Sequence, residues 1–245
     1  MQLPQPTDAL HKAWLYRVLS SLYEDAEIAS ALAFKGGTCA SMLGWVDRFS
    51  VDLDFDFLGE GKDLKKMERR MKKIFSDLGL IVKDQSVKIP QFFLKYPAPA
   101  NERSSLKLDM TFPVIKANKY EFQRFVEINR IIKCQTVETL FANKLVDLSD
   151  RYYKNKSIAG QDFYDIHHFF SMGKRYNAEV IEERTGKEVK TFLKETIEFI
   201  DQKITEKIID EDLNSLLVYS RFKLARKFLK SETLMFLRDE IARKA

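Results

Sequence analysis

The spacing of hydrophobic residues along the chain changes from mixed in the N-terminal part to helical in the C-terminal part. After residues 6–8 (Pro-Thr-Asp), a sequence typical of a helix start, apolar residues recur every four positions as far as Leu22. The short apolar run 31–34 predicts a buried strand that ends at Gly36-Gly37, where a second helix follows. The chain therefore begins with a helix, a strand and a helix.

A strict two-residue alternation marks residues 51–57 (VDLDFDF) as a strand with one apolar and one acidic face. Further strand-like segments occur at 80–83, 91–96 and 106–112, and a turn sequence at 97–101 separates the last two. Together these segments predict a sheet.

From Thr136 onward, successive segments show the periodicity of amphipathic helices, as does the basic segment 62–78. We therefore predict an α+β fold in which a mixed sheet with helices precedes an α-helical C-terminal half. The expected domains are residues 1–135, the catalytic one, and 136–245, the helical one.

The composition is that of a soluble globular protein, with 45% hydrophobic and 31% charged residues among 245. A net charge of +5 is too small to establish a nucleic-acid partner. Basic residues gather at 62–73 and 221–244, where they either face phosphates or cover solvated helices. Cys39 and Cys134 have neither metal-binding nor redox spacing. With no apolar signal core or membrane-length run, we expect a cytoplasmic protein without membrane contact.

The candidate chemistry begins with the KGGT sequence at 35–38 and the pair Asp52 and Asp54. A glycine turn at a helix start can hold phosphate oxygens on backbone N–H groups. Two acids at alternate positions of a strand share one face, where they can bind Mg²⁺. These are the minimal parts for transferring a nucleotide from a triphosphate.

Three other interpretations of the acidic strand were compared. A calcium loop of the EF-hand type needs glycine at its sixth position, where this chain has Phe57, so it is rejected. A phosphatase of the haloacid dehalogenase type would have an apolar strand before the acid pair, whereas residues 47–50 are Asp-Arg-Phe-Ser, so this alternative is weaker but also stays open. A purely structural, charged edge strand stays open as the third alternative.

A third acid favours the transfer chemistry. Asp109 lies in the middle of a second alternating strand, LKLDMTF. If that strand lies beside residues 51–57, Asp109 joins Asp52 and Asp54 around a pair of metal ions, which in such sites are held by shared carboxylates.

The ordered segments KGGT, RFSVDLDF, LKLDMTF, ETLFANKLVDLSDR and DFYDI resemble the AbiEii/AbiGii toxin family of the DNA polymerase β-like nucleotidyltransferase superfamily, over about residues 30–170. The resemblance implies a nucleotidyltransferase core, a helical C-terminal half, an NTP substrate, Mg²⁺ or Mn²⁺ as cofactor, and a cognate antitoxin encoded nearby. These proteins are toxins of toxin–antitoxin and phage-defence systems. Some relatives transfer nucleotides to the acceptor end of tRNA.

The resemblance also implies roles for individual residues. The expected catalytic residues are Asp52, Asp54, Asp109 and Lys144, of which the three acids also bind metal. The expected nucleotide-binding residues are Gly36, Gly37, Thr38, Arg48, Ser50, Lys144, Arg151, Asp162 and Asp165.

Some of these residues have structural alternatives. Arg48 is either a phosphate ligand or a surface arginine in a loop, and Asp162 is either a site residue or a helix N-cap. Lys144 and Arg151, seven apart on one helix face, either contact the nucleotide or form a solvated stripe. The family usually has a basic residue before Asp162, where this chain has Gln161.

The predicted function is a Mg²⁺-dependent nucleotidyltransferase toxin that transfers NMP from an NTP to an acceptor, with a tRNA 3′ end as the expected acceptor. Two alternatives stay open. One is an NTP- or RNA-binding regulator without catalysis, and the other is nucleotidyl transfer to a protein or small molecule.

Overall fold

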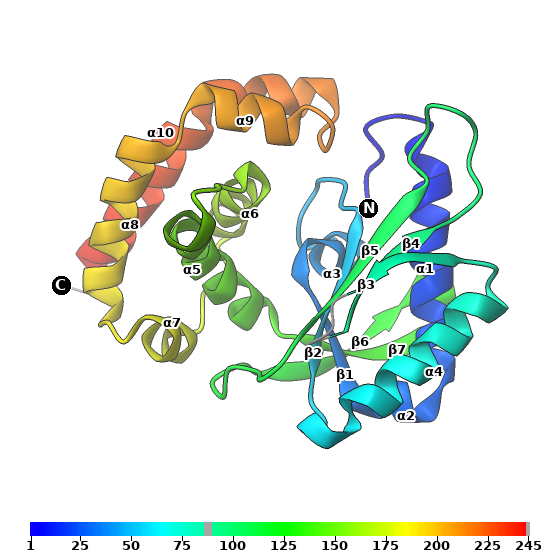
Figure 1. The fold of residues 1–245 in the computed structure, drawn as a ribbon. Helices are drawn as coiled ribbons and strands as arrows, with labels where there is room; N and C mark the ends of the chain where they lie inside the picture. The colour runs from blue at the N-terminus through cyan, green and yellow to red at the C-terminus, as the bar shows by residue number, and fades with distance from the viewer. Residues whose placement is uncertain (86–89, 244–245) are drawn as a thin grey trace.

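A single mixed sheet forms one side of the molecule (Figure 1). The computed structural model describes residues 1–85 and 90–243. The sheet order is β3-β4-β5-β2-β1-β7-β6, in which β2 pairs with β5 and β1 with β7 in parallel and the other pairs are antiparallel. The strands are β1 Leu32–Lys35, β2 Asp52–Phe57, β3 Ile81–Gln85, β4 Gln91–Lys95, β5 Ser105–Thr111, β6 Tyr120–Phe125 and β7 Arg130–Gln135.

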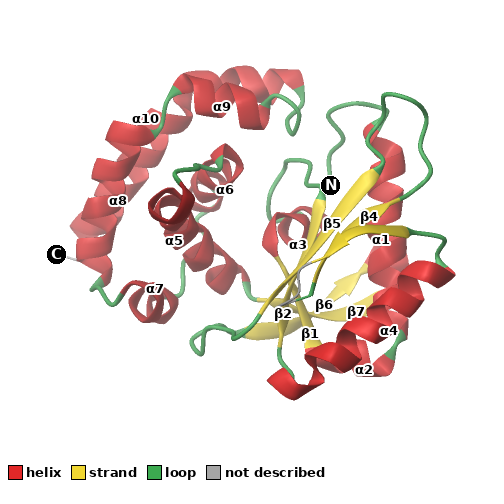
Figure 2. Cartoon of the chain, viewed as in Figure 1, coloured by secondary structure: helices red, strands yellow, loops and turns green. Residues whose placement is uncertain are grey.

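In the N-terminal part, helices precede the first strand and separate later ones. After β7, the described chain is helical apart from its connections (Figure 2). The N-terminal helices are α1 Asp8–Glu24, α2 Ala26–Ala31, α3 Gly36–Met42 and α4 Leu64–Asp77. The C-terminal helices are α5 Val137–Asn155, α6 Gly160–Ser171, α7 Ala178–Thr185, α8 Val189–Lys203, α9 Glu206–Leu213 and α10 Tyr219–Arg243. Helices α7 to α10 form an arc around α5 and α6.

Two hydrophobic cores hold these parts together. The first lies between the sheet and helices α1 and α4, with members such as Leu53 and Phe75. The second lies among the C-terminal helices, with Phe141 as a member. Helix α3 joins them because Cys39 belongs to the first core and Ala40 to the second. The loop after α3 is therefore positioned by both halves of the molecule.

The predicted α+β class is confirmed, with a seven-stranded sheet followed by helices. The strands expected near 31–34, 51–57, 80–83, 91–96 and 106–112 are all present. The second helix begins at Gly36, slightly earlier than predicted.

Strands β6 and β7 were missed. Strand β6 is an edge strand whose sequence, YEFQRF, mixes polar and apolar residues without a buried face.

Both basic segments are helical. In α4, Lys66 pairs with Glu27, and Arg70 pairs with Asp25 and Glu27, so α2 and the residue before it neutralise part of this charge. The segment 221–243 belongs to α10, and Lys244 lies outside the described residues. Among the described helices, none combines the length and the apolar character that crossing a membrane requires.

Candidate active site

The three predicted acids lie together on neighbouring strands. Strands β2 and β5 are parallel neighbours, with Asp54 directly opposite Asp109 and Asp52 opposite Lys107. Asp52 and Asp54 are two residues apart, so both point to the face of the sheet that carries Asp109. The prediction that the strand of Asp109 lies beside the acidic strand is confirmed.

The surroundings of two of these acids raise their pKa values. Burial raises the pKa of Asp54 to about 6, and the negative charges of Asp52 and Asp109 add to this effect. Burial also raises the pKa of Asp52. Among the described residues, Asp109 is the member of the cluster whose carboxylate has direct polar partners: its Oδ2 accepts hydrogen bonds from Lys107 Nζ at 2.8 Å and Gln91 Nε2 at 2.9 Å. The cluster therefore carries more negative charge than its protein neighbours offset.

The third aspartate of β2 has a different place. Asp56 is fully buried, its Oδ1 lies 2.7 Å from Lys35 Nζ, and its Oδ2 accepts hydrogen bonds from Tyr120 at 2.8 Å and Gln135 at 2.6 Å. Asp56 thus ties β2 to β1, β6 and β7. Because β2 lies inside the sheet, the alternative of a charged edge strand is wrong.

The glycine turn is shaped by close approach of side chains. Gly36 has a φ of +77°, and a Cβ there would overlap Asp54 Oδ2. A Cβ on Gly37 would overlap Nη2 of Arg48. The two glycines therefore let the acid from β2 and the arginine from the following loop reach the start of α3.

Two predicted nucleotide-binding hydroxyls are turned inward. Thr38 is fully buried, and its Oγ1 donates to the carbonyl oxygen of Asp52 and lies 2.9 Å from Ser50 Oγ. Ser50 is also buried. These side chains connect α3 to the start of β2, and their role in nucleotide binding stays a prediction.

Arg48 is neither exposed nor aimed at the pocket. Its Nε and Nη2 each donate to one oxygen of Asp165 at 2.6 Å, and its Nη1 donates to the carbonyl oxygen of Phe49 at 2.9 Å. Both members of the pair are buried. The expectation of a phosphate ligand and the alternative of a surface arginine are both replaced by a buried, bidentate pair between the loop and α6.

The remaining predicted residues extend this pair into a network. Lys144 of α5 is bonded to Asp162 and lies 3.2 Å from Asp165, while Arg151 Nε lies 3.2 Å from Asp162. Against the cost of burial, Lys144 and Arg151 hold the pKa of Asp162 below its ordinary value. Asp162 lies inside α6, so the N-cap alternative is wrong. Both aspartates are fully buried and are paired with basic side chains.

The acids and this network face each other across a cavity of about 330 Å³. It is bordered on the sheet side by Gly36, Asp54 and Asp109, and on the helical side by Lys144 and Arg151. Sequence reasoning missed several other lining residues: Asp56, Thr111, Asn118, Gln135, Asn143, Asp147 and Arg184.

The missed Arg184 of α7 reaches back to α5. Its Nη2 donates to Asp147 at 2.8 Å, and its Nη1 donates to Asn143 Oδ1 at 3.0 Å. It follows no motif, so only the packing of α7 against α5 could reveal it.

The acid cluster fits a divalent metal by its chemistry. Among residues 1–85 and 90–243, no three His, Cys, Asp or Glu side chains are arranged as a formed metal site. Carboxylate oxygens are nevertheless the ligands that Mg²⁺ and Mn²⁺ prefer. Burial, together with the charges of Asp52 and Asp109, disfavours the ionised form of Asp54, and a bound cation would favour that form.

Comparisons with known proteins agree with this fold. A protein described as a proposed nucleotidyltransferase from H. pylori is 17% identical, with a TM-score of 0.59 over 98% of this chain and 96% of that one. JHP933 from Helicobacter pylori is 17% identical, with a TM-score of 0.56 over 99% of this chain and 98% of that one. An antigenic nucleotidyltransferase-like protein from Paracoccidioides brasiliensis is 14% identical, with a TM-score of 0.51 over 88% and 96%.

These likenesses concern the fold alone, and a search of curated proteins finds no match. The family profile described as nucleotidyl transferase AbiEii toxin, type IV TA system, matches residues 17–226. The match includes both the acid cluster and the network of α5 and α6. The chain belongs to the AbiEii family of nucleotidyltransferase toxins.

Proposed function

We propose that this nucleotidyltransferase transfers a nucleoside monophosphate from an NTP to the 3′ hydroxyl of an RNA, with tRNA as the acceptor. The observation that carries the proposal is the cavity with Asp54 and Asp109 on one side and Lys144 and Arg151 on the other. A triphosphate bound there would present its negative charge to the basic side chains and its α-phosphate to the acids.

In the proposed reaction, the acceptor hydroxyl oxygen forms a bond to the α-phosphorus. The bond from that phosphorus to the oxygen bridging to the β-phosphate breaks, and pyrophosphate leaves with the bonding electron pair. The hydroxyl proton passes to the carboxylate of Asp109, which is 33% exposed and borders the cavity. The protein contributes mainly by positioning and by electrostatic stabilisation, as in phosphoryl transfer generally.

The helical half would hold the triphosphate. Arg151 is half-exposed, and its guanidinium can bind phosphate oxygens through two donors. Lys144 is nearly buried, and its position is fixed by Asp162 and Asp165. Arg48, held by the same Asp165, would keep the Gly36-Gly37 turn in place beside the triphosphate.

Asp52, Asp54 and Asp109 would hold Mg²⁺ or Mn²⁺. When bound, such ions offset phosphate charge and lower the pKa of a hydroxyl. Membership of a type IV toxin–antitoxin family implies an antitoxin partner. We further propose that this antitoxin is encoded by a neighbouring gene, that the pair acts in phage defence, and that transfer to tRNA in the cytoplasm stops translation.

The test is incubation of the purified protein with each α-³²P-labelled NTP, Mg²⁺ and total tRNA. The wild-type protein is expected to label RNA, and Asp54→Asn to reduce the rate sharply, because it removes a carboxylate that would hold the metal. Asp77→Asn on α4 is the matched control and should keep full activity, because Asp77 is an exposed residue remote from the cavity.

Three results would contradict the proposal. If no NTP labels RNA, the proposal that RNA is the acceptor is wrong. If a protein or a small molecule is labelled instead, that molecule is the acceptor. If Asp54→Asn transfers nucleotide at the wild-type rate, the proposed mechanism is wrong.

A further inference from the structure

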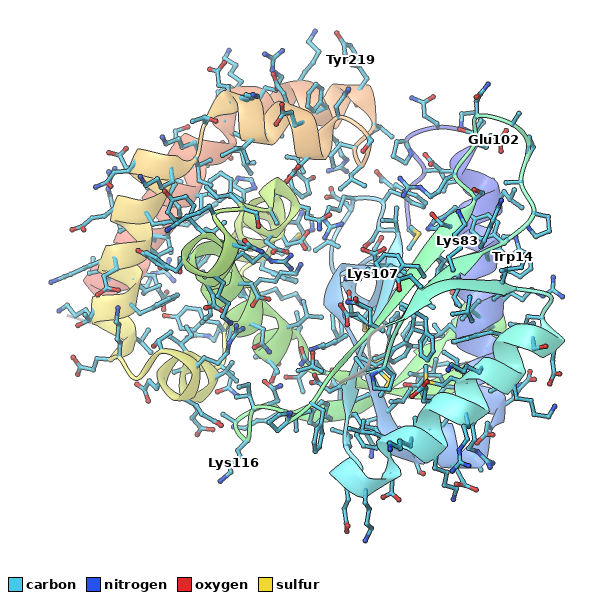
Figure 3. The ribbon with its side chains drawn as sticks, in the orientation of Figure 1. Trp14, Lys83, Glu102, Lys107, Lys116 and Tyr219 are labelled. Atoms are coloured by element: carbon cyan, nitrogen blue, oxygen red, sulfur yellow. The ribbon has the colours of Figure 1, made fainter. Side chains whose placement is uncertain are left out.

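The face of the sheet that carries the acids continues past them onto β4 and β3. Lys107 of β5 pairs on one side with Asp52 of β2 and on the other with Phe93 of β4. Gln91 is likewise opposite Asp109. Since directly paired residues point to the same face of a sheet, Phe93 shares the face of the acid cluster. Figure 3 shows Lys107 on the side of β5 that is turned toward the helical half.

This part of the face is exposed and partly apolar. Phe93 is 37% exposed, although its neighbours Phe92 and Leu94 are fully buried in the core on the opposite face. Ile81 of β3 is 63% exposed and pairs with Lys95, which is itself exposed. We call Ile81, Phe93, Lys95 and Lys107 the β4 platform. Phe93 lies beside Lys95 and Lys107 on this face, and an aromatic ring next to basic groups can stack a base.

The platform carries basic side chains that can bind phosphate, with an acid, Asp84, on the same face. The two lysines are Lys95 of β4 and Lys107 of β5. Asp84 of β3 is paired with Phe93. Lys107 is already joined to Asp109, so the platform leads directly to the acid cluster. Aromatic rings that stack bases beside basic groups that follow the backbone are the usual means of binding single-stranded nucleic acid.

The platform and the cavity lie on different sides of Asp109. The cavity continues from Asp109 to Asp54, Lys144 and Arg151, whereas the platform continues from Asp109 through Lys107 to Phe93. Two substrates that approach from these two sides would meet at Asp109. This is the geometry that a transfer between an NTP and a second, larger substrate requires.

We propose that the β4 platform binds the single-stranded 3′ end of the acceptor RNA. A base near that end stacks on Phe93, a neighbouring phosphate binds Lys95, and the terminal hydroxyl lies at Asp109. Phe93 and Lys95 are two positions apart on one strand, about 7 Å, so one nucleotide can contact both. The inference rests on the proposed function and adds the surface that recognises the acceptor.

The first test measures binding without turnover. A fluorescein-labelled oligoribonucleotide of about eight residues with a free 3′ hydroxyl is titrated with protein in the absence of NTP. Phe93→Ala is expected to raise the Kd by about tenfold or more, because base stacking on an aromatic ring contributes that much. Lys95→Ala should reduce the slope of log K against log salt by about 0.7, the value for one phosphate contact with a single strand.

Phe122→Ala is the matched control. Phe122 is 69% exposed on β6, at the opposite edge of the same sheet, and pairs with Lys133 on the same face. It should leave the Kd unchanged. Each variant is checked by its melting temperature, which should stay at the wild-type value because these side chains are exposed. Wild-type binding by Phe93→Ala, or an equal loss with Phe122→Ala, would overturn the assignment.

A second measurement separates this inference from the proposed function. In the transfer assay, Phe93→Ala should raise the KM for RNA and leave the KM for NTP unchanged. Normal transfer by Phe93→Ala with an unchanged KM for RNA would overturn the platform and leave the proposed function intact. If the wild-type protein transfers nothing, the proposed function fails, and the binding titration still decides whether the platform holds RNA. Label on a protein acceptor would overturn the inference.

Discussion

Two groups of aspartates border the candidate site, and they differ in how their charge is offset. On the sheet, Lys107 is the one cation among the described residues that pairs directly with the acid cluster, through Asp109. On the helical side, the buried pair Asp162 and Asp165 is surrounded by three cations. The acids on the sheet are partly exposed and have fewer cationic partners among the described residues, whereas the pair in the helices is fully buried and closely paired.

The difference appears in the pKa values. Burial raises the pKa of Asp54 to about 6, and neighbouring acids add to the rise. Asp162 is at least as buried, yet Lys144 and Arg151 hold its pKa below the ordinary value. A carboxylate with surplus charge is prepared for a cation from outside the chain, while a neutralised one maintains the positions of its partners. We therefore propose a ligand-binding role for the acids on the sheet and a positioning role for the acids in the helices.

The strongest test of this contrast is removal of Asp165. In Asp165→Ala, the guanidinium of Arg48 loses both of its carboxylate bonds in a buried position. We expect the free energy of unfolding to fall by about 3–5 kcal/mol, the usual effect of leaving one member of a buried pair alone. Urea denaturation monitored by circular dichroism measures it.

The control removes a solvent-exposed acid of the same type. Asp77→Ala breaks an exposed pair with Lys73 and should change the free energy of unfolding by less than about 1 kcal/mol. The double variant Arg48→Met/Asp165→Leu should regain much of the stability lost in Asp165→Ala, because it leaves no buried charge alone. An Asp165→Ala variant as stable as Asp77→Ala would contradict a structural role for the network.

On the sheet side, the contrast predicts a pH dependence. The ordinary pKa of Asp54 is 3.8 and burial raises it to about 6 in the folded protein. Between about pH 4 and pH 6, the folded state therefore retains a proton that the unfolded chain has released. The free energy of unfolding must fall as pH rises through this window, by about 2–3 kcal/mol in total.

Denaturation of the wild type and Asp54→Asn in EDTA at pH 4, 5, 6 and 7 measures this effect as the difference between the two curves. The variant should lack this part of the slope, and excess Mg²⁺ should reduce the difference for the wild type at pH 7. Parallel curves for the two proteins would show that Asp54 carries no surplus charge.

The sequence was sufficient for the acid cluster and insufficient for the network opposite it. Strands β2 and β5 have period-two patterns, which also determine that Asp52 and Asp54 share a face. Arg48 and Asp165 are 117 residues apart, and no local sequence pattern predicts which arginine pairs with which acid over that distance. The buried pair therefore became visible only when α6 was placed against the loop after α3.

The same limit applies to other side chains whose orientation no local pattern determines. Thr38 and Ser50 were assigned to the nucleotide because they lie beside the motif residues, but tertiary packing turns both hydroxyls inward. Strand β6 was missed because a sheet edge imposes no alternation of buried and exposed residues on it.

The smallest expected change in the free energy of unfolding concerns Asp47. It lies in the same loop as Arg48 but nearer the surface, and it also contacts the helical half. Its Oδ1 accepts a hydrogen bond from Tyr164 at 2.7 Å and lies 3.3 Å from His168 Nδ1, while its Oδ2 pairs with Arg221. Since Arg221 is 44% exposed, solvent weakens this pair.

We expect Asp47→Asn to lower the free energy of unfolding by about 1 kcal/mol, a third or less of the effect of Asp165→Ala. A double-mutant cycle with Arg221→Ala should give a coupling below about 1 kcal/mol. If Asp47→Asn cost as much as Asp165→Ala, the loop would be held from the surface, and the buried pair would no longer explain the position of the glycine turn.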